Sequence, residues 1–251
     1  MLLRGLRGSN RVTRILKQGK GFKGVYKIVV IGSTGAGKTT LLKCLLGDLF
    51  KPTGEQKRRT DVENQLDATH TWYRVGGETT GTIDSTTTVS VNTAGILLVR
   101  TLYNSIEFHS LASADELILR DDVDSIFQLV FFDTAGQERF DFIPEMTLRG
   151  ADVAIIIADG TNISSIEKIG YFVEITQREE ERSPDRIPII VMLNKKDLAK
   201  YGAFIGLEAV KRILDHDNYF DFHETSALSG EGIGDSVHSL MSRLHEKTIG
   251  K

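Results

Sequence analysis

The chain has 251 residues, of which 40% are apolar and 26% are charged, and its formal net charge at pH 7 is −3. These values are typical of a soluble protein with room for one large α/β domain with insertions. The single cysteine, Cys44, excludes an intramolecular disulfide and suits a reducing compartment, and no apolar run approaches the roughly 20 residues of a membrane-spanning helix. The sequence therefore predicts a cytoplasmic protein.

The first 24 residues form a basic arm. Residues 1–27 carry eight basic side chains and no acidic one, which leaves 23 basic against 34 acidic side chains in the rest of the chain. Several glycines disfavour a stable helix here, so the sequence favours a flexible, solvated arm. One alternative is peripheral attachment to an anionic membrane surface, with apolar contacts from Leu2, Leu3, Leu6, Ile15 and Leu16. A cleaved organellar presequence is the other.

A buried strand, a glycine-rich turn and a helix open the predicted domain, which covers residues 25–251. The β-branched run before Gly32 predicts the strand, and leucines from Leu41 onward recur with helical spacing. In such a turn successive N–H groups point at phosphate oxygens, Lys38 reaches the β- and γ-phosphates, and the Thr39 hydroxyl ligates Mg²⁺. The predicted nucleotide-binding residues of the turn are Gly32, Ser33, Thr34, Gly35, Ala36, Gly37, Lys38, Thr39 and Thr40.

Two stretches after the first helix read as insertions, near residues 51–86 and 95–124. Residues 51–86 are polar with little periodicity, and most of them are predicted to form a long mobile loop. The sequence then becomes β-like, and short strands are predicted at 86–91, 96–99, 104–108 and 116–119. A further buried strand over residues 126–132 ends at Asp133.

The second half alternates between strands and helices. Strands are predicted at 153–158, 187–193 and 220–224, and helices at 164–180, 207–214 and about 237–244. The run Ser164-Ser165-Ile166-Glu167 predicts a capping box at the start of the first of these helices. The alternation predicts an α/β fold with a mostly parallel central sheet, helices on both faces and ligands at the carboxyl ends of the strands.

Three short segments predict a binding site for a metal ion and a binding site for a nucleotide base. Asp133-Thr134-Ala135-Gly136 suits a carboxylate that orders Mg²⁺ through water and an amide that reaches a γ-phosphate. In Asn194-Lys195-Lys196-Asp197, Asp197 can accept the N1–H and 2-amino donors that guanine has and adenine lacks, Lys195 can lie along the ring, and Asn194 can tie this loop to the phosphate loop. Thr225-Ser226-Ala227 completes the pocket, with the Ala227 amide available to the guanine oxygen.

Taken together, these motifs resemble the Ras-like small GTPases over residues 27–246, because the segments at 32–39, 133–136, 194–197 and 225–227 occur in the family's order. Residues 137–140 and 148–152 look Rab-like, and 137–144 together with 86–89 also look like prokaryotic and archaeal Ras-like GTPases. The resemblance implies a molecular switch that binds GTP and GDP with Mg²⁺ and hydrolyses GTP slowly. It also implies an exchange factor, a GTPase-activating protein and effectors as partners, and no nucleic acid is expected.

The resemblance assigns catalysis to Gln137, which would position the attacking water, together with Lys38 and a switch threonine that would also ligate Mg²⁺. Lys38 and Asp133 are 95 positions apart, far more than is typical of small GTPases, so this threonine is hard to place. Thr88 is favoured because it immediately precedes a β-like Val-Ser-Val run. The alternatives are Thr87, Thr79, Thr80 and Thr82.

Two other functions compete with the switch. A constitutively nucleotide-bound scaffold is disfavoured by the intact Thr39, Asp133 and Gln137, and a metabolic P-loop kinase would give residues 194–197 no purpose.

His238 and His245 lie seven residues apart on one predicted helix face and have no cysteine partner at zinc spacing. They are predicted to be surface or packing residues.

Overall fold

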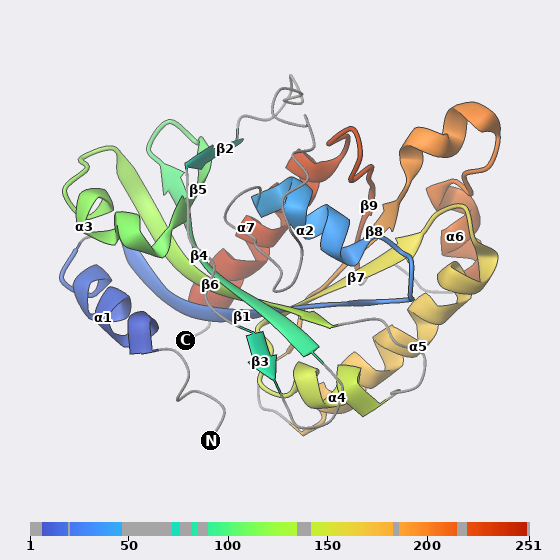
Figure 1. Ribbon diagram of the computed structural model, residues 1–251, viewed down its shortest axis with the longest axis horizontal. Coiled ribbons are helices and arrows are strands. Elements are labelled where there is room, and N and C mark those ends of the chain that lie inside the picture. Colours follow the sequence, from blue (N-terminus) through green and yellow to red (C-terminus); the bar gives the residue numbers. More distant parts are fainter. Residues whose placement is uncertain are drawn as a thin grey trace.

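A computed structural model describes residues 7–19, 21–46, 72–75, 82–84, 90–134, 142–182, 186–214 and 220–249 (Figure 1). Within them, the strands are β1 (Phe22–Gly32), β2 (Trp72–Val75), β3 (Thr82–Asp84), β4 (Ser90–Thr101), β5 (Ile106–Ser110), β6 (Val123–Thr134), β7 (Val153–Asp159), β8 (Ile189–Asn194) and β9 (Asp221–Glu224). The α-helices are α1 (Arg7–Leu16), α2 (Lys38–Leu46), α3 (Ala114–Leu117), α4 (Phe142–Leu148), α5 (Ile163–Glu180), α6 (Leu207–Leu214) and α7 (Ile233–Ile249). None of these helices combines the length and apolar character needed to cross a bilayer.

The described strands form one sheet of nine strands in the order β2-β5-β4-β6-β1-β7-β8-β9, with β3 paired to β4. The pairs from β6 through β1, β7 and β8 to β9 are parallel, and so is the pair of β2 and β5. Strand β4 runs antiparallel to β3, β5 and β6. The predicted mostly parallel sheet is therefore confirmed. Its antiparallel part consists of β3 to β6, of which β5 lies wholly within the predicted second insertion.

Helices cover both faces of the sheet, as predicted. Alternate residues of β1 point to opposite faces: Ile28 and Val30 belong to the core beneath α2 and α7, whereas Val29 and Ile31 belong to the core beneath α5. A third, smaller cluster lies beneath α1 and α3 at one end of the sheet, away from α5 and α6 (Figure 1). The edge that carries the predicted motifs is thus supported from both sides.

Helix α1 replaces the flexible arm that the sequence favoured, so that prediction is wrong for residues 7–16. Leu16 is fully buried in the third cluster, and Thr13 Oγ1 donates a hydrogen bond of 2.8 Å to Gln128 Oε1 on β6. Most of the arm's glycines lie before or after the helix, and burial of an apolar face supplies the stability that intrinsic propensity lacks. Strand β1 also starts at Phe22, so the predicted boundary at residue 24 falls inside it.

The insertions differ from their prediction in three places. Residues 90 and 91 of the strand predicted at 86–91 and the whole strand predicted at 96–99 belong to the long strand β4, which pairs with β6 along its length. Residues 86–89 lie outside the described residues. Residues 114–117 form helix α3 where a strand was predicted, since Leu117 is buried and Leu119 is 80% exposed, and a strand would put both on one face. Strands β2 and β3 interrupt the predicted loop at 51–86, and the rest of that loop lies outside the described residues.

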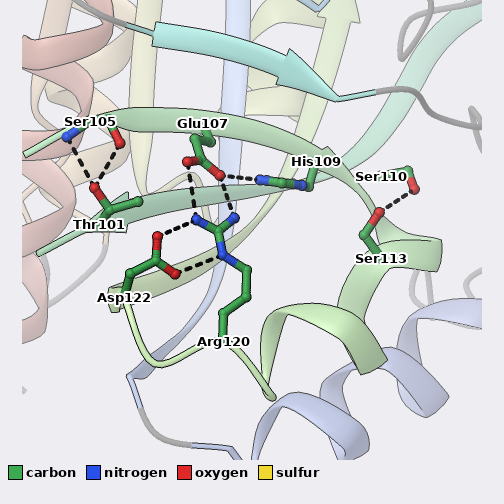
Figure 2. Close-up of polar contacts among 8 residues, drawn as sticks. All are labelled: Thr101, Ser105, Glu107, His109, Ser110, Ser113, Arg120 and Asp122. Atoms are coloured by element: carbon green, nitrogen blue, oxygen red, sulfur yellow. Dashed lines mark hydrogen bonds and ion pairs between the residues drawn. The ribbon is translucent and has the colours of Figure 1, made fainter. Parts of the chain in front are cut away.

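A polar network fastens the β4–β5 hairpin to the segment after α3 (Figure 2). The Arg120 guanidinium donates to both Glu107 oxygens, at 2.7 and 3.2 Å, and to both Asp122 oxygens, at 2.8 and 2.7 Å. His109 Nε2 lies 2.7 Å from Glu107 Oε2. Hydrogen bonds from Arg120, opposed by burial, lower the pKa of Glu107. The network holds the outer face of the hairpin as two bidentate ion pairs.

The helix after β7 starts earlier than predicted. Asn162 caps α5, because its side-chain oxygen accepts a hydrogen bond from the Ser164 amide. Ser165, a member of the predicted capping box, contacts the strand end instead: its Oγ accepts a hydrogen bond from the Asp159 amide at 2.9 Å. The predicted capping box is therefore wrong, and the helix start is tied to the end of β7.

Candidate functional site

Four neighbouring parallel strands bring the predicted motifs to one edge of the sheet. Val30 of β1 is in register with Asp133 of β6, Gly32 of β1 with Ile157 of β7, and Asp159 of β7 with Asn194 of β8. The turn after β1, the carboxylate that ends β6 and the loop after β8 therefore lie side by side. This is where ligands bind in open parallel sheets.

The turn between β1 and α2 is closed around Lys38. Lys38 is buried, and its Nζ donates hydrogen bonds to Gly32 O at 2.8 Å and to Ser33 O at 2.9 Å. Burial lowers the pKa of Lys38, and the nearby Asp133 carboxylate opposes this effect. The turn thus holds one cation over its own backbone at the N-terminus of a helix, which is an arrangement suited to an anionic ligand.

Position 37 leaves no room for a side chain. Its φ is +94°, and a Cβ there would lie 2.3 Å from Asn194 Nδ2. The turn and the loop after β8 therefore approach more closely than any other residue would allow.

Thr39 and Asp133 lie together beneath the turn. Thr39 Oγ1 donates to Asp133 Oδ2 at 2.9 Å, and Asp133 is buried at the end of β6. The next residue, Thr134, anchors the same strand end through a 3.0 Å bond from its hydroxyl to Val30 O. A hydroxyl beside a carboxylate suits Mg²⁺, which is typically held by one or two protein oxygens together with phosphates and water. Among the described residues, no group of three or more His, Cys, Asp or Glu side chains is placed to hold a metal ion.

Asn194 joins the glycine-rich turn of residues 32–40, the phosphate loop, to the last motif, residues 225–227. Its Nδ2 donates to Ala36 O at 2.9 Å, as the sequence predicted, and its Oδ1 accepts from the Ala227 amide at 2.9 Å. The sequence had left the Ala227 amide available to a guanine oxygen, whereas in the structure this amide donates to Asn194. The side chain of Asn194 is buried, so both of its polar ends are satisfied inside the protein.

Ser226 orients the carboxylate of Asp197. Ser226 is fully buried, and its Oγ donates to Asp197 Oδ1 at 2.6 Å while accepting from the Ser229 amide at 3.1 Å. Backbone bonds from Thr225 N to Leu193 O and from Lys196 N to Thr225 O hold the two loops together, at 2.7 and 3.0 Å. Asp197 is thereby fixed by a residue of the neighbouring motif.

Asp159 is a site residue that the sequence motifs missed. Its Oδ2 lies 2.6 Å from Lys195 Nζ, and its Oδ1 accepts from both the amide and the hydroxyl of Thr161, at 2.9 and 2.6 Å. Although burial opposes it, hydrogen bonds from Lys195 and Thr161 lower the pKa of Asp159. One signal could have revealed it: Asp159 and Asn194 are the last residues of β7 and β8, and Asp133 is the last but one of β6.

Several predicted residues cannot be placed. Outside the described residues lie Gly136, Gln137, Thr88, Thr87, Thr79 and Thr80, together with the side chain of Thr82. Their roles remain predictions.

A sequence model of the Ras family matches residues 114–246, which is just over half of the chain. The chain belongs to the Ras family. This match contains Asp133, residues 194–197 and residues 225–227, whereas the phosphate loop lies before it.

Individual Ras-family proteins match over a similar length. Ras-related protein Rab-5B of Plasmodium falciparum is 30% identical over 120 residues, covering 48% of this chain and 55% of that protein. The GTP-binding protein ypt5 of Schizosaccharomyces pombe is 30% identical over 123 residues, 49% of this chain and 56% of that protein. RABA4b of Arabidopsis thaliana is 32% identical over 120 residues, 48% of this chain and 51% of that protein. The match thus spans about half the length of these relatives.

Proposed function

We propose that this Ras-family chain binds GTP and GDP with Mg²⁺ and hydrolyses GTP slowly, as a molecular switch. The observation that carries the proposal is the buried side chain of Asn194, which bonds to the phosphate loop at Ala36 and to the last motif at Ala227. It makes one site from a turn suited to phosphates and a loop whose carboxylate suits guanine. Neither half alone would specify a guanine nucleotide.

Each side chain then has a separate task. Lys38 and the N–H groups of residues 33–40 bind the phosphates, and Asp197 accepts the two adjacent donors of guanine. Lys195, held by Asp159, lies along the face of the base. Because the Ala227 amide already donates to Asn194, we assign Ala227 to closing the pocket more than to reading the base.

Thr39 and, through water, Asp133 are the residues that would hold Mg²⁺, whose chemistry is to neutralise charge on the β- and γ-phosphates. Thr88 is our candidate for the additional switch ligand. Gln137 follows Gly136, and its amide can both donate to and accept from a water in line with the γ-phosphate. We infer that Lys38, Thr88 and Gln137 form the catalytic set.

Exchange factors, GTPase-activating proteins and effectors are the partners that this function requires. Helix α1 supports an additional contact with anionic membranes, because Arg11 and Arg14 are exposed on it and Lys17 is exposed directly after it. Leu16 and its apolar neighbours are occupied by the core, so the contact would be electrostatic and weakened by salt.

Two measurements on the full chain test which base is bound, whether GTP is hydrolysed and whether Gln137 is catalytic. We expect the nucleotide released on denaturation to be a guanine nucleotide. In single turnover we expect Gln137→Leu to lower hydrolysis at least ~10-fold with GTP affinity unchanged, since leucine keeps the volume and loses both hydrogen bonds.

The matched control is Gln177→Leu on the exposed face of α5. Release of an adenine nucleotide would favour a kinase over a GTPase. Tight GTP binding without hydrolysis by the unmodified chain would favour a nucleotide-bound scaffold. Equal rates for Gln137→Leu and Gln177→Leu would remove Gln137 from the catalytic set.

A further inference from the structure

A cavity of about 460 Å³ lies between the β4–β5 hairpin and α7. It is far from the proposed nucleotide site: Arg100, which lines it, is eight residues along β4 from Asn92, the register partner of Asp133. At about 3.3 Å per residue this is roughly 26 Å. Its volume is within the usual range for small-molecule sites.

The lining of the cavity combines cationic and apolar groups. Arg100, His238, His245 and Asn104 supply polar groups, and Ile106 and Met241 supply apolar surface. Among the described residues that line the cavity, no side chain is acidic. The histidine pair that had no role in the sequence is thus brought together with an arginine from the opposite wall.

The hairpin wall is held from its other side. Ile106 faces the α7 core, whereas the next residue, Glu107, belongs to the Arg120 network on the opposite face (Figure 2). At the hairpin tip, Thr101 Oγ1 and Ser105 Oγ are 2.7 Å apart. These bonds fix the wall independently of anything in the cavity, which lowers the cost of ordering a site for a ligand.

Arg100 and His245 are only partly satisfied by the protein. Asp124 Oδ2 lies 3.1 Å from Arg100 Nε, whereas Arg100 Nη1 lies 3.5 Å from His245 Nε2. His245 Nε2 is also 3.5 Å from Ser125 Oγ. Both 3.5 Å contacts are at the long limit for a hydrogen bond, so these donors and the ring nitrogen can bind a further group.

We propose that this cavity binds a small organic anion in which a carboxylate or phosphate adjoins an apolar group. The guanidinium of Arg100 and a protonated His245 would bind the anionic oxygens, with His238 and Asn104 nearby as further polar partners. Ile106 and Met241 would contact the apolar part. Inorganic phosphate alone would use only half of this lining.

The anion should bind with uptake of a proton at His245. Burial, then Arg100, then Lys23 lower the pKa of this imidazole, and Asp124 opposes them. Among the described residues, the uncharged Phe127 also packs on the ring, with centroids 5.1 Å apart, and the uncharged Ser125 hydroxyl lies beside it. A bound anion favours the imidazolium and raises this pKa, so affinity increases as pH falls from 8 to 6.

The test is a titration of the full chain with phenyl phosphate in excess GDP and Mg²⁺, so that the phosphate loop is filled. The resonances of the His238 and His245 ring protons report binding by NMR. We expect saturable shifts at both rings, binding about tenfold weaker for phenol and for inorganic phosphate, and tighter binding at pH 6 than at pH 8. A benzoate titration distinguishes a carboxylate preference from a phosphate preference.

Arg100→Gln should weaken phenyl phosphate at least about tenfold, and Arg14→Gln, at an exposed position of α1, should leave it unchanged. His245→Gln provides a second variant in case Arg100→Gln unfolds, and it should abolish the pH dependence. Shifts that are absent, or affinities that are equal in Arg100→Gln and Arg14→Gln, would overturn the proposal. The result does not depend on which nucleotide the phosphate loop prefers.

Discussion

The two ends of the sheet are built on different principles. At the β7–β9 end the strands have four to seven residues, and polar side chains that hold the site together, such as those of Asp159 and Asn194, lie at their carboxyl ends. At the hairpin end, α1 and α3 cover the long strands β4 and β6, and the Arg120 network fastens β5. Among the described residues, no predicted site residue lies around this network. In our proposals, recognition of the base belongs to the first end, and the second end contributes stability and the proposed anion site.

The largest effect on this comparison is expected from changing Asp197, whose carboxylate is proposed to bind the base. We expect Asp197→Asn to weaken GTP by about 3 to 4 kcal/mol, which is several hundredfold, because an amide cannot accept both guanine donors and loses the charge. The variant should instead prefer xanthine nucleotides, whose base oxygen can accept from the new amide. Competition binding with GTP, ATP and XTP measures both effects.

Asp121→Asn is the matched control, since Asp121 is exposed at the hairpin end. Equal GTP affinities for the two variants, or equal ATP and GTP affinities in the unmodified chain, would contradict the base assignment.

The β7–β9 end was largely predictable because its information is local. The residues around Asn194 and Ser226 lie at the ends of β8 and β9, and parallel strands carry such residues to a common edge. Asp159 escaped prediction because its partner, Lys195, lies 36 positions away and no motif links the two. The bond from the Ala227 amide to Asn194 was not predicted for a similar reason, as its acceptor is on another strand.

The hairpin end was less predictable because long-range burial decides its local structure. Leu16 is buried against residues from β4, α3 and β6, and none of these contacts is visible in a window of sequence around it. Helix α3 has only four residues, and its preference is set by which of them the core accepts.

Removing one buried side chain at the hairpin end should therefore affect stability and spare the site. Leu16→Ala leaves a cavity in the third cluster, so we expect the free energy of unfolding to fall by about 2 to 3 kcal/mol. GTP affinity should stay within about twofold, because Leu16 touches no site residue. Urea denaturation at saturating GDP, together with a binding assay, measures the two quantities.

Leu119→Ala is the control, because Leu119 is 80% exposed and its truncation should cost less than about 0.5 kcal/mol. If both variants lost the same small amount, α1 would not be docked in solution and the flexible arm would be reinstated. A large loss of GTP affinity in Leu16→Ala would instead show that the two ends are coupled.

The smallest expected effect sharpens the assignment of Asp159. Asp159→Asn keeps an acceptor for Thr161 but loses the ion pair with Lys195 Nζ, so the lysine should be held less firmly over the base. We expect nucleotide release to accelerate by roughly fivefold, about 1 kcal/mol, and equally for GDP and GTP, because the base face is common to both. Since hydrogen bonds lower the pKa of Asp159, its carboxylate stays ionised near neutrality, and this group should add no pH dependence to release between pH 6 and 8.

Glu174→Gln breaks the exposed pair with Arg178 on α5 and provides the control, which should release nucleotide at the unmodified rate. If Asp159→Asn behaved like Glu174→Gln, or if it changed GTP release without changing GDP release, Asp159 would not act through Lys195, and the β7–β9 end would owe its base recognition to the loop after β8 alone.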